Sequence, residues 1–457
     1  MSWTVALPEA LIGLGALAAT FMPAPQRNRR GVQIPVVFGA LLAVAWIAEL
    51  SAGAATGTAF DGGFVQDRLA LYAKSFLILA ALLGVVLADW EIADRSEREV
   101  SLLLWACFGG LVAASAGSLA ELWAGCLLAV VAALAALGAY PRLLLAAAAT
   151  MLLAGLGFAY VYAFAGQSDL TGIAARLPDG VTTGSLVVAA VVAITGLGGI
   201  FVSAGLIVRG AGAWPADASV AAAPIAGLAA GTGAVALLRF DGALVGSAAG
   251  WSPLLAVFAA VALLAGAAGA LGARSIRGLV GWLTLAQGGW ILAGLAAHGR
   301  FAVAGSLFLL GIFLVAYCGL SSLLGEDLLD RLPALAGHGT RAPAAAAAIA
   351  VALLSLAGAP PFGGWFGEFS VAAALVQGGY YWLLFVGLGS GLLALAAVGR
   401  VLAMIFLSDP AEGTVTVLNS IRVAASVALV AVVIGFALFA NPLHGLAMQG
   451  AEGLQLP

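Results

Sequence analysis

Apolar residues occur along this chain in long runs that are separated by short polar stretches. A helix that crosses the hydrocarbon core of a bilayer needs about 20 mostly apolar residues, and most of the runs have about that length. Dividing the chain at its charged and turn-rich stretches predicts an all-α polytopic membrane protein with fourteen transmembrane helices. The predicted spans are 4–22, 33–52, 69–88, 101–117, 119–139, 143–166, 182–208, 221–239, 251–272, 279–297, 301–323, 343–376, 380–407 and 421–440.

The twelfth run is interrupted in its middle by the sequence SLAGAPPFGGWFGEF, residues 355–369. Proline removes a backbone donor and glycine allows a kink, so the segment predicts a broken helix. Backbone groups freed by such a break must be satisfied at membrane depth by other protein groups or by a water-filled cavity. A proline kink that only shapes helix packing is the alternative interpretation. The residues concerned are Pro360, Pro361, Gly363 and Gly364, followed by the carboxylate of Glu368.

Composition supports the membrane assignment. Apolar residues make up 63% of the 457 residues and charged residues only 9%, whereas a soluble domain has about 25% charged residues. Such a chain has too few polar groups to cover a water-exposed surface, so the lipid bilayer is its predicted solvent. The net charge of −3 gives no indication of a nucleic-acid partner.

Arginine is distributed unevenly between the two sets of loops. Loops that follow odd-numbered spans carry Arg27, Arg29, Arg30, Arg95, Arg98, Arg142, Arg209, Arg274, Arg277, Arg331 and Arg341. Loops on the opposite face carry only Arg68, Arg176, Arg239 and Arg300. The positive-inside rule places the first set in the cytoplasm, so both termini are expected on the outer face. The N-terminus lacks the features of a signal peptide and has Glu9 at the start of its first apolar run.

The sequence contains no motif for a bound redox group or nucleotide. The cysteines Cys107, Cys126 and Cys318 have no metal-binding spacing, and the three histidines fall at or near predicted helix ends. A GxGxxG turn, a P-loop, a CxxC pair and a CxxCH sequence are all missing. Any cofactor is therefore expected in a partner protein, and this chain is expected to hold none.

Several segments together carry a family resemblance. The stretch LLSLAGAPPFGGWFGEFSVAAALVQGGYYWLLFVGLGSGLLALAAVGRVLAMIFL resembles the antiporter-like membrane subunits of complex I, above all subunit N of bacterial NADH-quinone oxidoreductase. LPEALIGLGALAA, FDGGFVQDRLALYAKSFLILAALLGVVL, ARSIRGLVGWLTLAQGGWILAGL, EDLLDRLPALAGHG and NPLHGLA are similar to family segments in the same order. The resemblance covers nearly the whole chain and agrees with the fourteen spans that were counted independently.

The resemblance implies a fold of two inverted five-helix repeats, each with a broken helix. The corresponding division is an N-terminal three-helix segment with its cytoplasmic loop, two antiporter-like repeats and a C-terminal helix with a tail. These parts are expected at 1–100, 101–240, 251–407 and 408–457.

The resemblance also implies a proton path, from which this chain departs. Family members have a glutamate in the fifth span and lysines in the seventh, eighth and twelfth. Here the first three positions fall near Leu127, at Val202 or Gly205, and near Ala230, and the twelfth-span lysine is replaced by Glu368. Arginine cannot replace the lost lysines because it stays protonated. The first repeat is therefore expected to be inactive in proton transfer.

Six residues remain as candidates for a proton path. Glu368 is the leading one, with Arg400 as its expected partner, and a structural Glu–Arg brace is the alternative. Lys74 matches a family lysine but could also extend its amine to the outer interface. Glu121, Gln287 and Arg239 are weaker candidates; Glu121 is favoured as an interfacial acid and Gln287 as a helix-contact amide.

By resemblance, the function is that of a membrane-arm subunit in a proton-translocating quinone oxidoreductase of the bacterial inner (plasma) membrane. Other membrane-arm subunits are the implied partners, and quinone, flavin and iron–sulfur clusters are expected only in partner subunits. Two alternatives share the fold. One is a subunit of a multisubunit cation/proton antiporter, and the other is a subunit of a related assembly such as a membrane-bound hydrogenase or a carbon-uptake complex.

Overall fold

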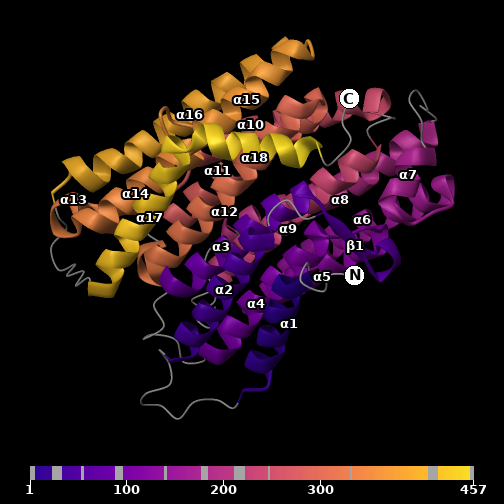
Figure 1. The fold of residues 1–457 in the computed structure, drawn as a ribbon. Coiled ribbons are helices and arrows are strands. Elements are labelled where there is room, and N and C mark those ends of the chain that lie inside the picture. The colour runs from indigo at the N-terminus through magenta and orange to yellow at the C-terminus, as the bar shows by residue number, and fades with distance from the viewer. Residues whose placement is uncertain are drawn as a thin grey trace.

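Each of the fourteen apolar runs coincides with a helix, or with a pair of helices, in a computed structural model of the protein (Figure 1). The structure describes residues 6–22, 33–52, 56–87, 96–137, 141–176, 184–209, 222–244, 248–329, 332–409 and 420–452. Of the arginines used to predict the topology, Arg27, Arg29, Arg30, Arg95 and Arg331 lie outside these residues.

The N-terminal segment combines three helices with a small hairpin. Its elements are α1 (Leu7–Thr20), α2 (Gln33–Ala52), β1 (Gly57–Ala59), the 3-10 turn η2 (Phe60–Gly62), β2 (Phe64–Gln66) and α3 (Arg68–Leu87). The two strands are antiparallel, with Thr58 opposite Val65. Isolated bridges join Phe64 to Ala116 and Ser118 to Asp169. The hairpin is therefore connected to the loop that follows α4, and this loop is in turn bridged to the loop that follows α6.

The helices of the first repeat are α4 (Ser96–Ala114), α5 (Leu119–Ala136), α6 (Pro141–Ala165), the short α7 (Leu170–Arg176), α8 (Gly184–Arg209) and α9 (Ala222–Leu244). The second repeat contains α10 (Ala248–Leu271), α11 (Ile276–Ala297), α12 (Arg300–Leu329), η4 (Leu332–Leu335), α13 (His338–Arg341), α14 (Pro343–Leu356), α15 (Gly363–Gln377) and α16 (Tyr381–Leu407). The remaining helices are α17 (Ser420–Leu438) and α18 (Ala440–Glu452).

Among the described residues, nine helices are long and apolar enough to cross a membrane, or ten if α17 and α18 are counted as one bent span. The fold class is thus confirmed as an all-α polytopic membrane protein, while the number of fourteen crossings and the domain limits stay predictions. Helices α9 and α12 form the centre, since all of the apolar stretch of α9 and 94% of that of α12 are buried.

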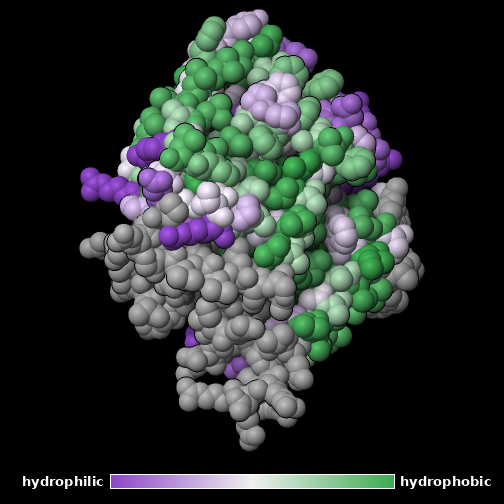
Figure 2. Space-filling model, turned by 90° about the vertical axis from the view of Figure 1, so that its left-hand side faces the viewer, coloured by the Kyte–Doolittle hydropathy of each residue, from purple (hydrophilic) through white to green (hydrophobic). Residues whose placement is uncertain are grey.

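Apolar side chains also cover much of the exterior. Figure 2 shows a broad hydrophobic surface on one side of the molecule, with hydrophilic side chains gathered at its edges. Only a third of the apolar stretch of α16 is buried, and Phe385, Leu388 and Leu392 on this helix are largely exposed. Lipid or neighbouring membrane proteins must cover such a surface, because an apolar patch of this extent is unfavourable in water.

The break in the twelfth span lies between α14 and α15 and is confirmed. Carbonyl groups of an α-helix normally accept from the N–H four residues later. For Leu356 and Ala357 these later residues are Pro360 and Pro361, which have no N–H. The helix ends at Leu356, and Gly358 adopts the left-handed φ of 67° that suits a glycine at such an end.

A corresponding break in the first repeat was expected, but α8 runs without interruption from Gly184 to Arg209. No proline interrupts this helix, so its N–H donors remain available. Two glycines of α8 are needed because α8 packs closely against α6. A Cβ at Gly196 would overlap the backbone of Ala154, and one at Gly199 would lie 2.5 Å from the Thr150 side chain, both on α6.

The C-terminal helix α18 bends by 73° from α17 and packs against α3 and α12. It was not predicted as a separate element. Glu452 near its end forms ion pairs with Arg68 at the start of α3 and with Arg300 at the start of α12. Helix α18 also borders a mostly apolar cavity of about 570 Å³, together with α2, α3 and α17.

Candidate functional site

The helix break is bridged by the side chain of Gln287 on α11. Its Nε2 donates to the carbonyl of Leu356 at 2.8 Å, which is one of the two groups left without a helical donor by the proline pair. The same nitrogen donates to Oε1 of Glu368 at 3.0 Å. A carboxamide has two N–H donors, so Gln287 connects the end of α14 to the acid on α15.

Glu368 lies in a close-fitting space beside the break. A Cβ at Gly358 would overlap the Glu368 carboxyl group, so only glycine leaves room for the acid at this place. The start of α15 is held by Ser355, whose hydroxyl accepts from the N–H of Gly364 at 3.3 Å. The break thus holds an ionisable side chain against unwound backbone, which is a typical arrangement of ion sites in membrane proteins.

The expected pairing of Glu368 with Arg400 is wrong. Arg400 on α16 instead donates through Nη2 to the carbonyl of Ala273 at 2.7 Å, near the end of α10. A guanidinium near a helix C-terminus satisfies carbonyls that have no helical partner. The partner of Glu368 is the neutral amide of Gln287, as described above.

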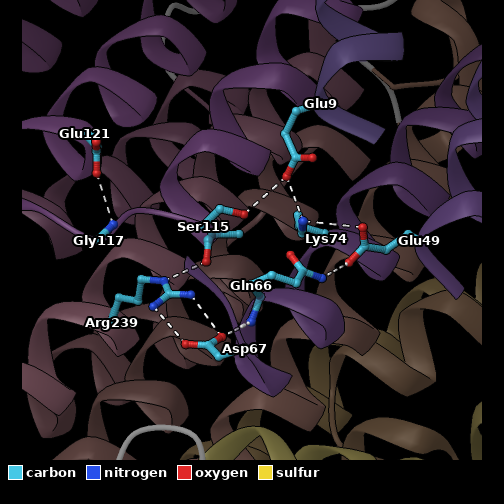
Figure 3. A network of polar contacts seen from close by, with 11 residues as sticks. Glu9, Glu49, Gln66, Asp67, Lys74, Ser115, Gly117, Glu121 and Arg239 are labelled. Carbon is cyan, nitrogen blue, oxygen red and sulfur yellow. Dashed lines mark hydrogen bonds and ion pairs between the residues drawn. The ribbon is translucent and has the colours of Figure 1, made fainter. Parts of the chain in front are cut away.

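A second cluster of ionisable groups lies in the N-terminal segment (Figure 3). The ammonium group of Lys74 on α3 is 2.7 Å from Oε1 of Glu9 on α1 and 3.4 Å from Oε2 of Glu49 on α2. It also faces the ring of Phe64 at 5.3 Å from the centroid. The Lys74 side chain is fully buried, so the alternative in which it extends to the outer interface is wrong.

Two neutral side chains extend this cluster. Gln66 on β2 donates through Nε2 to Oε1 of Glu49 at 2.8 Å, and the Ser115 hydroxyl donates to Oε1 of Glu9 at 3.2 Å. The backbone joins the same elements, since the N–H of Val65 donates to the carbonyl of Ser115 at 2.8 Å. The hairpin therefore closes the cluster at one end of the helices.

Arg239 on α9 forms a separate ion pair beside this cluster (Figure 3). Its two terminal nitrogens bind the two carboxylate oxygens of Asp67 at 3.0 and 3.1 Å, and its Nε donates to the carbonyl of Ala114 at 2.6 Å. Bidentate geometry of this kind fixes orientation as well as charge. Arg239 therefore joins the end of α4 to the chain between β2 and α3.

Glu121 caps the helix on which it lies. Its Oε2 accepts from the N–H groups of Gly117 and Ser118 at 3.1 Å each, and the Ser118 hydroxyl accepts from the N–H of Glu121. Together these bonds form a capping box at the start of α5. The carboxylate is thus engaged in the cap, and its interpretation as an interfacial acid stays a prediction.

The positions where the first repeat departs from the family pattern are apolar in the structure. Leu127 is half-buried on α5 and Ala230 is buried on α9, whereas the surroundings of Val202 and Gly205 lie outside the described residues. One acid of this repeat was missed. Asp241, one turn before the end of α9, is buried, and neither of its carboxylate oxygens has a hydrogen-bond partner among the described residues.

The sequence analysis also missed Glu49, Gln66 and Asp67, and it noted Glu9 only as the start of an apolar run. A signal was present, since Glu9 and Glu49 are single acids inside predicted spans and such residues are costly unless paired. The hydrophobic pattern of the sequence does not indicate that the carboxylates of Glu9 and Glu49 both contact Lys74. Three successive helices contribute the three charged groups, and only the fold shows that these groups meet.

Comparison with known proteins shows the family. A family model described as NADH:quinone oxidoreductase/Mrp antiporter, transmembrane, matches residues 119–394, more than half of the chain. The chain is 26% identical to NADH-quinone oxidoreductase subunit N of Desulforamulus reducens, over 99% of this chain and 98% of that protein. Two solved structures share the fold. A chain of the Mrp complex from a Dietzia species is 18% identical over 99% of this chain and 98% of its own length, with a TM-score of 0.82. A chain of respiratory complex I from Thermus thermophilus is 19% identical over 97% and 99%, with a TM-score of 0.79.

The fold and the buried ionisable groups define an antiporter-like, multi-pass membrane protein. The chain belongs to the NADH:quinone oxidoreductase/Mrp antiporter family of membrane proteins. The resemblance to subunit N that the sequence motifs indicated is therefore confirmed over nearly the full length of the chain.

Proposed function

We propose that the protein is a membrane-arm subunit of a complex I-type quinone oxidoreductase in the bacterial plasma membrane. In this complex, electron transfer takes place in other subunits, which hold the flavin, the iron–sulfur clusters and the quinone site. The full-length likeness to subunit N relatives supports this assignment. The exposed apolar side chains of α16 support burial against lipid and neighbouring subunits.

The contribution of this chain to proton translocation rests on Glu368. The observation that carries this proposal is the contact of its carboxyl group with Gln287 and Gly358 at the helix break. A carboxyl group there can take up and release a proton, while unwound backbone at membrane depth favours a hydrated neighbourhood. The first repeat, with Leu127 and Ala230 at the family's ionisable positions, serves in structure and coupling.

The experiment is the substitution Glu368→Gln in the assembled complex, with protons translocated per electron as the readout. Gln keeps the shape and can still accept from Gln287, but it cannot ionise. We expect normal assembly and a lower proton-to-electron ratio. Glu452→Gln on α18 is the matched control, since this acid is 40% exposed and distant from the break in sequence.

The opposite pattern would show that Glu368 is only a brace. In that case Glu368→Gln lowers assembly or stability, and the surviving complexes translocate protons at the normal ratio. Purification of the native complex tests the assignment as a whole. Co-purification of quinone-module and other membrane-arm subunits is the expected result, and recovery of this chain with cation/proton antiporter subunits alone contradicts it.

A cation/proton antiporter subunit is the second candidate, and the fold likeness to the Mrp complex chain favours it. The two candidates differ in their energy source. In the first, proton transfer through this chain requires electron flow to quinone. In the second, a cation gradient alone drives it.

A further inference from the structure

The cluster of Glu9, Glu49 and Lys74 lies outside both five-helix repeats and is not part of the Glu368 site. Its three side chains come from α1, α2 and α3, the N-terminal segment. They are 10%, 0% and 0% exposed. All three lie near the same end of the helices, because Glu9 is in the first turn of α1, Glu49 in the last turn of α2 and Lys74 in the second turn of α3.

The charges of this cluster do not balance. Two carboxylates and one ammonium group give a net charge of −1 if all three are ionised. The neighbouring charged groups do not correct this, because Asp67 and Arg239 neutralise each other and Glu121 is engaged in the cap of α5. On α4, the thiol of Cys107 donates to the carbonyl of Leu77 and is neutral. An uncompensated charge in a buried site is costly, and one added proton removes it.

The hydrogen-bond inventory leads to the same conclusion. Oε2 of Glu9 and Oε1 of Gln66 are buried acceptors without a hydrogen-bond donor among the described residues. Oε2 of Glu49 is met only by the Lys74 ammonium group, at 3.4 Å. Buried polar atoms are normally satisfied. A proton on either carboxyl group turns one of these surplus acceptors into a donor.

We propose that Glu9, Glu49 and Lys74 form a proton-binding site that holds one exchangeable proton. The Lys74 amine lies between the two carboxyl groups, 2.7 Å from Oε1 of Glu9 and 3.4 Å from Oε2 of Glu49, so both carboxyl groups belong to one site for the proton. Uptake is the protonation of one carboxylate to a carboxylic acid, and release is the reverse step, with no other bond made or broken. Glu9 is the group through which the proton exchanges, because its side chain is 10% exposed, whereas Glu49 is closed off and bonded to Gln66.

The sequence offers a direct probe of this site, because Lys74 is the only lysine in the chain. The full chain is labelled with lysine carrying ¹⁵N at Nζ, reconstituted in phospholipid vesicles and studied by solid-state NMR between about pH 5 and 9. We expect one resonance with the shift of an ammonium group at every pH. We also expect this resonance to move in a single step as the neighbouring carboxyl pair gains or loses its proton.

Two variants assign the step. Glu49→Gln, or Glu9→Gln if the first variant does not fold, removes the step and leaves the ammonium resonance in place. Glu368→Gln leaves the step unchanged, so failure of this proposal is distinct from failure of the proposed role of Glu368. A wild-type resonance that does not move over this pH range overturns the proposal, as does a Lys74 that is neutral at pH 7 or a step that survives in both Glu9→Gln and Glu49→Gln.

Discussion

At the scale of single residues, one amide performs two tasks at the helix break. Gln287 replaces the N–H that Pro360 lacks, and it also positions the carboxyl group of Glu368. A titratable acid beside a break therefore requires a neutral donor that serves both the backbone and the acid. Arginine in this place would fix the charge of the acid, and an apolar residue would leave a buried carbonyl without a donor.

The substitution Gln287→Leu tests this role. It removes both bonds at similar volume, and the unpaired Leu356 carbonyl should lower the free energy of unfolding by about 1–3 kcal/mol. The measurement is the Tm of the detergent-solubilised protein. Thr284→Val on the same helix is the control, because the Thr284 hydroxyl donates to the carbonyl of Val280 within α11 and has no other hydrogen-bond partner among the residues that the structure describes. Equal Tm values for the two variants would contradict the bridging role.

Stability should also depend on pH through His298, which lies between α11 and α12. Burial against Trp251 and Ser252 lowers the pKa of His298 to about 4, whereas an unfolded histidine has a pKa of about 6.5. As the pH falls between these values, the unfolded chain binds a proton that the folded chain excludes, so stability decreases. Above a pH of about 6.5, His298 is neutral in both the folded and the unfolded chain, so it no longer makes stability depend on pH.

We therefore expect Tm to fall from pH 7 to pH 4 more steeply in the wild type than in His298→Gln. This shift of the His298 pKa corresponds to a loss in the free energy of unfolding on the order of 1–3 kcal/mol between pH 7 and pH 4. Parallel Tm profiles for the two proteins would show that His298 does not contribute.

At the scale of elements, the sequence predicted the helices far better than their partners. Runs of apolar residues defined the helices to within a few residues, and the proline pair located the break between α14 and α15, because both signals are local. The pairing of Glu368 with Arg400 was wrong because adjacency in sequence does not fix which faces of α15 and α16 meet. The bend before α18 and the packing of α18 were missed, because this helix is short and its sequence is less apolar than those of the predicted spans.

One buried connection between elements passes through Arg239. It ties α9 to the end of α4 and to Asp67 before α3, with a side chain only 6% exposed. Arg239→Met should lower stability by about 3–5 kcal/mol, because it leaves Asp67 as an unpaired, largely buried charge. Arg300→Met is the matched control. Arg300 is 45% exposed and shares Glu452 with Arg68, so a change below about 1 kcal/mol is expected.

Unfolding of the purified variants by denaturant measures this difference. A loss for Arg239→Met no larger than that for Arg300→Met would show that the buried pair adds nothing beyond a surface contact.

At the scale of the whole molecule, the polar contacts of the arginines agree with the predicted assignment of the loops to two opposite faces. Arg68, Arg239 and Arg300, all assigned to the outer face, contact Glu452, Asp67 and Ala114 at the ends of other helices. On the opposite face, Arg98 in the first turn of α4 donates to the carbonyl of Ala135 near the end of α5. Arg98 and Arg239 thus lie at opposite ends of α4, since Arg98 is in its first turn and Arg239 bonds to Ala114 at its last residue. The orientation of these two ends in the membrane is a separate prediction.

Cysteine labelling determines that orientation. The three native cysteines are buried, so an introduced one gives a clear signal. Thr171→Cys in α7 should react with a membrane-impermeant maleimide in intact cells, whereas Asp409→Cys after α16 should react only after permeabilisation. Both positions are exposed in the structure. The reverse pattern would invert the predicted topology.

The position of α18 has a consequence for biosynthesis. Arg68 and Glu452, which join α3 to α18, are separated by 384 residues. At a translation rate of about 5–20 residues per second, roughly 20–80 s pass between the synthesis of the two partners. During this interval the face of α3 that α18 later covers is open to lipid, and the guanidinium of Arg68 has headgroup phosphates as its available anions. Docking of α18 must therefore displace lipid from a helix that has already been inserted, which makes this contact a late event in the assembly of the chain.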